Sequence, residues 1–263
     1  MSFAKIGGVS LHYRFTPSSA DAEPIVFINS LGTDFRIWDT VAADLADEAP
    51  TLVYDKRGHG LSDLGDGIRS IDDHVDDLLW LLERLVIGRA IICGLSVGGL
   101  IAQRLYQRRP ELVASLILCD TAHRIGTAEM WNTRIATVEA QGMAAIADGV
   151  MEKWFTPHFH ANRAAELAGY RNMLIRQPVA GYAGTCAAIR DADYTDATAD
   201  IAVRTLCVVG DQDGSTPPDL VRSLANLIPG SRFDIIRDAG HIPCVEQPDA
   251  LAALIRGFVA SGA

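Results

Sequence analysis

Short apolar runs alternate with longer amphipathic stretches along most of the 263-residue chain. The short runs have the length of buried strands, and the longer stretches carry apolar residues at helical spacing. Since parallel strands need crossover connections, this alternation predicts a mostly parallel sheet with helices on both faces. The expected strands are residues 25–28, 52–54, 91–93, 116–119, 206–209 and 233–236.

Local signals define several further elements. Gly7 and Gly8 separate two short strand-like pieces and predict a hairpin turn. Ser70 is the expected N-cap of a long helix with apolar residues at positions 75, 78, 79, 82 and 85. Other helices are expected at residues 37–45, 218–227 and 248–259.

The alternation of strands and helices stops between residues 122 and 195. Helical patches and loop signals fill this segment without a convincing strand. We expect an inserted helical cap over the carboxyl ends of the strands, where open α/β sheets bind ligands. The predicted domains are a core of residues 1–121 and 196–263 and a cap of residues 122–195.

Charge and composition exclude several classes of function. A net charge of −10 and an isoelectric point near 5.1 argue against nucleic acid or an anionic membrane as partner. No apolar run approaches the roughly 18 residues that span a bilayer. The five cysteines are scattered and odd in number, which predicts no disulfide framework. We therefore expect a soluble cytoplasmic protein, and the sequence predicts nothing about its oligomeric state.

The most informative stretch for chemistry is residues 94–98, Gly-Leu-Ser-Val-Gly, between an expected strand and an expected helix. Gly94 and Gly98 allow a sharp turn in which strand and helix pack closely. The turn raises the Ser96 hydroxyl above the sheet, beside the free N–H groups of the helix N-terminus. This placement suits a nucleophile.

A serine nucleophile needs a base, and the base needs an acid that orients it. After this turn the expected chain order is serine, acid, histidine. Asp213 follows the strand at 206–209 and is our choice for the acid, with Asp211 and Asp120 as rivals. His241 follows the strand at 233–236 and is our choice for the base.

The oxyanion formed when Ser96 attacks needs fixed donors. One is expected to be the backbone N–H of Val97, directly after the nucleophile. The other is expected from the loop at residues 29–32, where Leu31 N–H is the best candidate by position.

Other polar clusters have simpler interpretations. His158 and His160 have no third ligand at suitable spacing, so we expect no metal site. Residues 55–62 form a glycine-rich strand exit, in which we expect an ion pair between Arg57 and Asp55. The pattern lacks the lysine of a phosphate-binding loop.

Five motifs together carry a family resemblance. They are Asn29-Ser-Leu-Gly-Thr33, Asp55-x-Arg57-Gly-His-Gly, Gly94-Leu-Ser-Val-Gly98, Gly210-x-x-Asp213 and Gly240-His241. This set resembles the α/β-hydrolase superfamily along the whole chain. The resemblance implies an eight-stranded, mostly parallel sheet with helices on both faces and an inserted helical cap.

A finer resemblance rests on the Ser-Leu-Gly loop, in place of the commoner His-Gly, and on the cap. The cap motifs are Asp120-Thr-Ala-His-Arg-Ile-Gly-Thr127, Trp131, Arg134, Lys153-Trp-Phe-Thr156 and residues 181–193. They are similar to 3-oxoadipate enol-lactonases of the bacterial protocatechuate route. Val97 stands where that family commonly has methionine, which leaves the backbone N–H available. The resemblance implies hydrolysis of 3-oxoadipate enol-lactone to 3-oxoadipate through an acyl-enzyme, without a cofactor.

The implied small lactone is an anion, which a chain of net charge −10 repels at long range. A local cation should therefore hold its carboxylate, preferably a planar guanidinium. We favour Arg134, with Trp131 beside it as an apolar wall. The other candidates in the cap are Arg124, Arg163 and Arg190.

Two other functions stay open. A general carboxylesterase or a cofactor-free perhydrolase would use the same three catalytic residues. A non-catalytic ligand receptor could keep the fold and pocket, but it would not need the nucleophile, acid, base and both oxyanion segments together.

Overall fold

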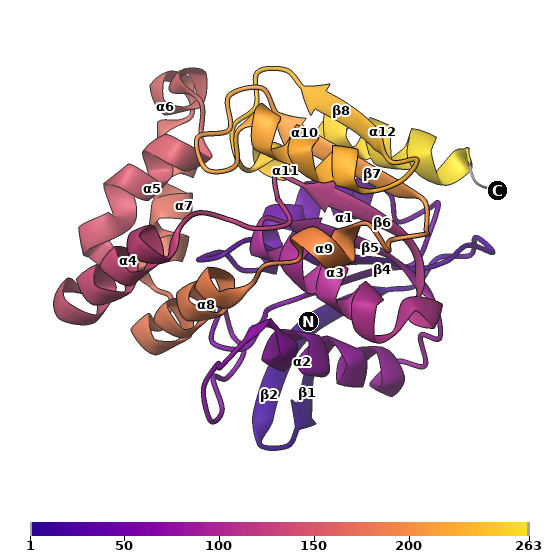
Figure 1. Cartoon of the computed structure of the whole chain (residues 1–263), viewed down its shortest axis with the longest axis horizontal. Coiled ribbons are helices and arrows are strands. Elements are labelled where there is room, and N and C mark those ends of the chain that lie inside the picture. Colours follow the sequence, from indigo (N-terminus) through magenta and orange to yellow (C-terminus); the bar gives the residue numbers. More distant parts are fainter. Residues whose placement is uncertain (1, 262–263) are drawn as a thin grey trace.

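Within the described residues, 2–261 of the computed structural model, eight strands form one sheet in the order β1-β2-β4-β3-β5-β6-β7-β8 (Figure 1). Strand β2 pairs antiparallel with β1 and β4, and the remaining neighbours pair in parallel. The predicted mostly parallel sheet is confirmed. The strands are β1 (Ser2–Ile6), β2 (Val9–Thr16), β3 (Ile25–Ile28), β4 (Thr51–Tyr54), β5 (Ala90–Leu95), β6 (Val113–Cys119), β7 (Thr205–Gly210) and β8 (Arg232–Ile236).

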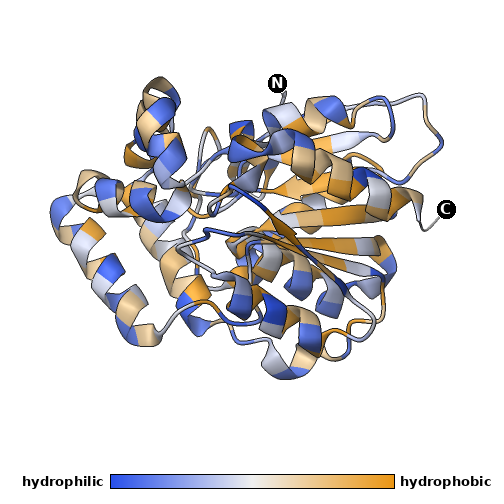
Figure 2. Ribbon diagram, turned by 90° about the horizontal axis from the view of Figure 1, so that it is seen from above, coloured by the Kyte–Doolittle hydropathy of each residue, from blue (hydrophilic) through white to orange (hydrophobic). Residues whose placement is uncertain are grey.

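Helices lie on both faces of this sheet, as Figure 2 shows. Helix α1 packs against α12, and α2 packs against α3, which also contacts β3, β5 and β6. The central strands are buried along their length because both of their faces are covered. The helices of the core are α1 (Asp39–Asp44), α2 (Ile71–Arg84), α3 (Val97–Arg108), α9 (Thr195–Thr198), α10 (Pro218–Leu227), α11 (Pro243–Glu246) and α12 (Pro248–Ala260), with the 3-10 turns η1 (Phe35–Trp38) and η2 (Pro110–Leu112).

Helices α4 to α8 connect β6 to β7 and form a separate layer, on the left of Figure 1. As expected, this connection contains no strand within the described residues. The exact bounds of core and cap stay a prediction. The elements are α4 (Ala128–Gln141), η3 (Met143–Ile146), α5 (Ala147–Trp154), α6 (Pro157–Asn162), α7 (Ala164–Ile175) and α8 (Val179–Asp191).

The expected elements are found with small shifts at their ends. The hairpin turn lies at residues 7–8, between β1 and β2. Ser70 caps α2 in a capping box, in which Asp73 accepts a hydrogen bond from the Ser70 N–H. Strands β5 and β6 extend furthest beyond the apolar runs that predicted them, because β5 continues through Gly94 and β6 begins before Ser115.

The helix predicted at residues 37–45 is wrong at its start. The chain enters it through η1, where the Asp34 side chain accepts a hydrogen bond from Arg36 N–H at 3.1 Å. Phe35 and Trp38 are both buried there. The tighter turn aligns residues three apart, so both side chains reach the core before the α-helical turn begins.

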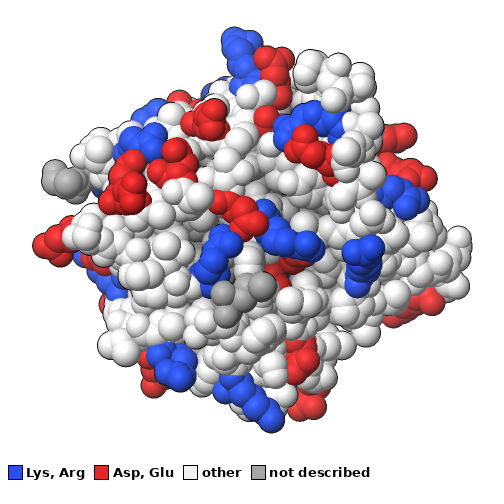
Figure 3. All heavy atoms as spheres, turned by 180° about the vertical axis from the view of Figure 1, so that it is seen from behind, with Lys and Arg blue, Asp and Glu red and all other residues white. Residues whose placement is uncertain are grey.

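Acidic and basic side chains are intermixed on the face seen in Figure 3.

All five cysteines are free and buried. Three of them lie on strands as expected, namely Cys93, Cys119 and Cys207. Among residues 2–261, no helix has both the length and the apolar character needed to cross a membrane.

Candidate active site

Ser96 lies in a strained turn between β5 and α3. Its φ and ψ angles are 58° and −118°, a backbone conformation that side chains rarely adopt. A Cβ on Gly94 would lie 2.2 Å from the carbonyl oxygen of Gly98, and one on Gly98 would lie 2.3 Å from that of Ile28. Both glycines are therefore required by close packing, as predicted.

Asp213 and His241 lie side by side at the carboxyl ends of β7 and β8. His241 Nδ1 is 2.9 Å from Asp213 Oδ2 and 3.0 Å from Oδ1, and both side chains are almost fully buried. A carboxylate in this position holds the imidazole with Nε2 free to act as a base. The structure thus brings together the acid and base chosen from the sequence.

Asp213 is held by its own loop as well. Its oxygens accept hydrogen bonds from Ser215 N–H at 2.7 Å and from Thr216 N–H and hydroxyl at 3.0 and 2.6 Å. Burial alone would raise the pKa of Asp213, but the charge of His241 and these hydrogen bonds hold that pKa below its usual value. Asp213 is therefore a fixed anion beside the imidazole.

Asp120, the rival acid at the end of β6, lies next to this pair. Its Oδ1 accepts a hydrogen bond from Gly210 N–H at 2.9 Å, while its buried Oδ2 has no donor among the described residues. Burial, followed by the charge of Asp213, raises the pKa of Asp120 well above its usual value. A neutral Asp120 can donate its proton toward Asp213, so it suits a supporting role.

We expect Asp120→Asn to gain stability relative to the wild type as the pH rises from 5 to 8. Because the pKa of Asp120 is raised on folding, the native state keeps a proton that the unfolded chain releases, and wild-type stability falls over this range. Asparagine is neutral at every pH. The melting temperature of the variant, relative to that of the wild type, should therefore increase by at least about 2 °C between pH 5 and 8. Melting curves followed by circular dichroism at several pH values measure this difference. An unchanged difference would mean that Asp120 is ionised in the native state.

Ser96 and His241 line the same pocket, beneath the cap. The pocket has about 640 Å³ of empty volume, counting its open mouth. No hydrogen bond joins the Ser96 and His241 side chains in the described part of the chain. Such catalytic contacts are often long before substrate binds. The other lining residues are Ser30, Leu31, Ile125, Gly126, Met130, Trp131, Arg134, Val150, Lys153, Trp154, Tyr182, Ile189, Ser215 and Thr216.

Arg134 and Trp131 both lie in this pocket, on α4. The Arg134 guanidinium is 5.8 Å from the centre of the Trp131 ring, and its Nη1 donates a hydrogen bond to the Tyr182 hydroxyl at 3.2 Å. Lys153, on α5, is a second pocket cation that sequence reasoning missed. Lys153 is exposed, and no local sequence pattern distinguished it from an ordinary surface lysine.

The three other candidate arginines of the cap are already paired with carboxylates. Arg124 pairs with Asp193 at 3.6 Å and Arg190 with Asp191 at 2.7 Å. Arg163 pairs with Glu166. Arg134 forms no ion pair within residues 2–261, so its charge is available to a ligand.

The candidate oxyanion donors come from two different segments of the chain. Leu31 lines the pocket on the loop after β3, and Val97 begins α3, where helical N–H groups have no partner within the helix. Gly32 has a φ of +76°, and a Cβ there would lie 2.5 Å from the Leu174 side chain. The cap thus packs directly against the loop that carries Leu31.

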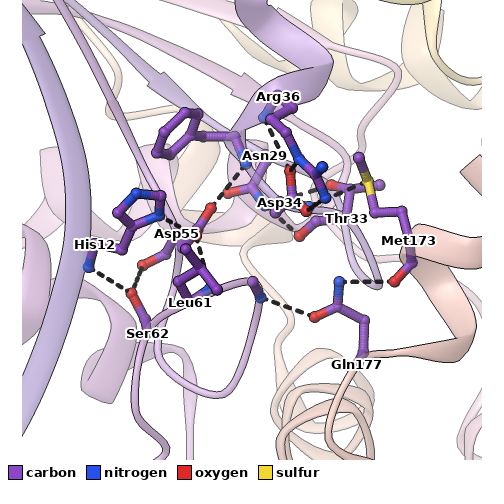
Figure 4. Close-up of polar contacts among 12 residues, drawn as sticks. His12, Asn29, Thr33, Asp34, Arg36, Asp55, Leu61, Ser62, Met173 and Gln177 are labelled. Carbon is purple, nitrogen blue, oxygen red and sulfur yellow. Dashed lines mark hydrogen bonds and ion pairs between the residues drawn. The ribbon is translucent and has the colours of Figure 1, made fainter. Parts of the chain in front are cut away.

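Figure 4 shows the polar contacts around Asp55, which bonds to the start of η1 just after this loop. Asp55 accepts hydrogen bonds from Phe35 N–H at 2.8 Å and Leu61 N–H at 2.9 Å, and it contacts His12 Nδ1 at 2.7 Å. The predicted ion pair between Arg57 and Asp55 is therefore wrong. Arg57 instead pairs with Asp77 on α2 at 2.6 Å, while the Asp55 carboxylate is already occupied by the three contacts just described.

One group of potential metal ligands occurs among the described residues. It consists of Asp120, Asp213 and His241, with ligand atoms within 4.8 Å of one another. Two of these residues are the candidate acid and base, which accounts for the cluster. His158 and His160 do not belong to it.

Glu246 connects the cap to the loop of His241, a role that the sequence did not indicate. Its carboxylate accepts hydrogen bonds from Gly240 N–H at 2.6 Å and from Thr156 N–H and hydroxyl at 3.0 and 2.8 Å. The carbonyl of Trp154 accepts a hydrogen bond from His241 N–H at 2.8 Å. The position of the base therefore depends on the end of α5.

Comparisons with known proteins agree with this architecture. Residues 23–248 match the family described as alpha/beta hydrolase fold. The 3-oxoadipate enol-lactonase 2 of Acinetobacter baylyi is 35% identical over 242 residues, 92% of this chain and 90% of that protein. The crystal structure of the enol-lactonase from Burkholderia xenovorans LB400 gives a TM-score of 0.94 at 36% identity, over 98% of this chain and 100% of that chain. A thermophilic esterase from Thermogutta terrifontis gives 0.91 at 28% identity, over 98% and 96%. The resemblance predicted from the motifs is confirmed.

Proposed function

Because the chain belongs to the α/β-hydrolase family, we propose that it hydrolyses 3-oxoadipate enol-lactone to 3-oxoadipate with Ser96, His241 and Asp213 as its catalytic triad. We place the reaction in the cytoplasm, in aromatic degradation by way of protocatechuate or catechol. The enol-lactonases at 35–36% identity support a lactone hydrolase. The observation that supports this choice of substrate is Arg134, which forms no ion pair with any described residue and lies beside the Trp131 ring in the pocket of Ser96.

The proposed first half-reaction opens the lactone ring. Ser96 Oγ attacks the ring carbonyl while His241 Nε2 takes the hydroxyl proton, and Asp213 stabilises the imidazolium. The N–H groups of Leu31 and Val97 donate to the tetrahedral oxyanion. The ring C–O bond then breaks and His241 returns the proton to the enol oxygen, which stays attached to the acyl chain and tautomerises to a ketone.

The second half-reaction releases the acid. His241 removes a proton from water, and the resulting hydroxide attacks the acyl carbonyl through the same oxyanion site. The bond to Ser96 Oγ breaks, the serine regains its proton, and 3-oxoadipate leaves. Every step uses groups of this chain and water, without a cofactor.

Arg134 is the proposed partner of the substrate carboxylate. A charge-assisted hydrogen bond contributes about 1.5–3 kcal/mol, so we expect Arg134→Ala to raise KM for the lactone about 10- to 100-fold. The KM for neutral p-nitrophenyl acetate should change less than about threefold, because that ester has no carboxylate. Steady-state kinetics with both substrates measure the difference. The matched variant Lys153→Ala tests the second pocket cation, and equal effects of Arg134→Ala on both substrates would remove Arg134 from this role.

The proposed function is tested by hydrolysis of enzymatically generated 3-oxoadipate enol-lactone, followed by its ultraviolet absorbance. We expect kcat/KM for the lactone to exceed that for p-nitrophenyl acetate by at least about 10²-fold, as expected when binding of the carboxylate contributes to the transition state. Weak lactone turnover beside strong ester turnover would identify a general carboxylesterase, a function that similarity to a thermophilic esterase supports. Peroxide-dependent turnover would indicate the perhydrolase.

A further inference from the structure

Lys56 is completely buried behind the loop that carries Leu31. It is the second residue after β4, and its Nζ donates hydrogen bonds to the carbonyl oxygens of Asn29 and Ser30, both at 2.9 Å. The Ser30 carbonyl also accepts a hydrogen bond from the Thr33 hydroxyl at 2.9 Å. An ammonium group therefore binds the two peptide units that lead into Leu31.

These contacts determine the direction of one candidate oxyanion donor. The carbonyl of Ser30 and the N–H of Leu31 belong to the same planar, trans peptide unit, so they point in opposite directions. Lys56 binds this carbonyl, so the N–H lies on the side of the peptide unit away from Lys56, and Leu31 lines the pocket of Ser96. Fixing the carbonyl thus fixes the N–H, and a cation on the carbonyl also strengthens that N–H as a donor, since connected hydrogen bonds polarise one another.

We infer that Lys56 is a positioning residue of the oxyanion hole, which aims and polarises the Leu31 N–H through the Ser30 carbonyl without touching substrate. The inference rests on the proposed serine mechanism, though not on the identity of the lactone. It predicts that the ammonium group contributes mainly to the transition state, where the oxyanion is formed.

The surroundings of Lys56 make this placement costly. Burial lowers the pKa of Lys56 to about 7, although the nearby charges of Asp55 and Asp34 raise it. Burial, followed by the charge of Lys56, lowers the pKa of both His59 and His74, which face it from the β4 exit loop and from α2. An apolar side chain would avoid this burial of charge. In the positioning role, the buried charge is used to bind the carbonyls that lead into Leu31.

A purely structural role makes a different prediction. The loop is also tied by Asp55 to Phe35 N–H and by the Thr33 hydroxyl, so loss of the ammonium leaves other contacts in place. If Lys56 only stabilises the fold, its replacement should lower the melting temperature and leave the kinetics of the folded enzyme unchanged. If it positions the oxyanion donor, the transition state should be weakened even in folded protein.

The test compares Lys56→Met, which keeps most of the length of the side chain without its charge, with Leu52→Ala on β4. Leu52 is fully buried and takes no part in the loop contacts, so its variant controls for lost stability. We expect Lys56→Met to lower kcat and kcat/KM for p-nitrophenyl acetate together by about 10²-fold, the usual effect of an oxyanion donor. Its inhibition constant for phenylboronic acid, which forms a tetrahedral adduct with serine, should rise by a similar factor. Leu52→Ala, assayed below its melting temperature, should stay within about twofold of the wild type in kcat, in kcat/KM and in the inhibition constant.

Lys56→Gln supplies a neutral amide donor in place of the ammonium group and provides the measurement if Lys56→Met does not fold. The kcat of Lys56→Gln should be lower than that of the wild type but not abolished, and its KM should be unchanged. Loss of activity that matches Leu52→Ala, or a change in KM alone, would overturn the inference. Ser96→Ala is run in parallel, so that ester hydrolysis independent of Ser96 would reject the serine mechanism itself. Hydrolysis that depends on Ser96 but not on Lys56 would reject only the positioning role.

Discussion

Ser96→Ala should lower kcat/KM for both the lactone and p-nitrophenyl acetate by at least about 10⁴-fold. The methyl group cannot attack a carbonyl, and the residual rate comes only from substrate binding and the oxyanion donors. The loss should be equal for an anionic and a neutral substrate, because both are attacked by the same atom. This expectation separates Ser96 from Arg134, whose replacement should discriminate between the two substrates.

The same variant should keep its fold. Ser96 is tied into the sheet by its backbone, since its N–H donates to the Cys119 carbonyl at 3.0 Å and its carbonyl accepts from the Thr121 hydroxyl at 2.6 Å. Alanine retains both contacts and the same Cβ, so its melting temperature should stay within about 2 °C of the wild type. Near-normal hydrolysis by a folded variant would reject Ser96 as nucleophile.

A covalent label checks the same conclusion without substitution. A fluorophosphonate probe should modify Ser96, which peptide mass mapping can locate. The pocket contains two other serines, Ser30 and Ser215. A label on either of them would reassign the nucleophile, and failure to label would favour the ligand receptor.

The sequence predicted those parts of the site that depend on local geometry. The glycines around Ser96 follow from the space that a sharp strand-to-helix turn leaves, and Asp213 and His241 follow from their places after strands. Parallel strands bring such positions to one edge of the sheet. Residues far apart in the chain could therefore be assigned to one site before their contacts were known.

Contacts that depend on packing between elements were not predictable in this way. Asp55 bonds to His12 on a neighbouring strand, and Arg57 reaches Asp77 on α2, although the sequence suggested that Asp55 and Arg57 pair with each other. The burial of Lys56 and the link made by Glu246 likewise depend on loops that meet only in the folded chain. A short segment of sequence contains no information about such tertiary contacts.

The choice of the acid is the part of the proposed triad that the sequence left open. Asp213 and Asp120 both follow strands, and both are buried close to His241. They differ in partners: the Asp213 carboxylate contacts His241 Nδ1 and receives donors from its own loop, whereas Asp120 binds the Gly210 N–H. The pKa of Asp213 lies below its usual value and that of Asp120 well above, so only Asp213 is suited to stabilise an imidazolium.

Asp213→Asn should therefore lower kcat by about 10⁴-fold, the scale expected when the base is held in the wrong tautomer and its cation is not stabilised. An asparagine amide in this position can donate to Nδ1, which leaves the proton on Nε2 where the serine proton must go. The matched variant, Asp120→Asn, replaces a neutral acid with a neutral amide, and kcat should stay within about tenfold of the wild type. Steady-state kinetics with p-nitrophenyl acetate, on variants shown by circular dichroism to be folded, measure both effects. A large loss in Asp120→Asn with a small one in Asp213→Asn would transfer the role of the acid to the end of β6.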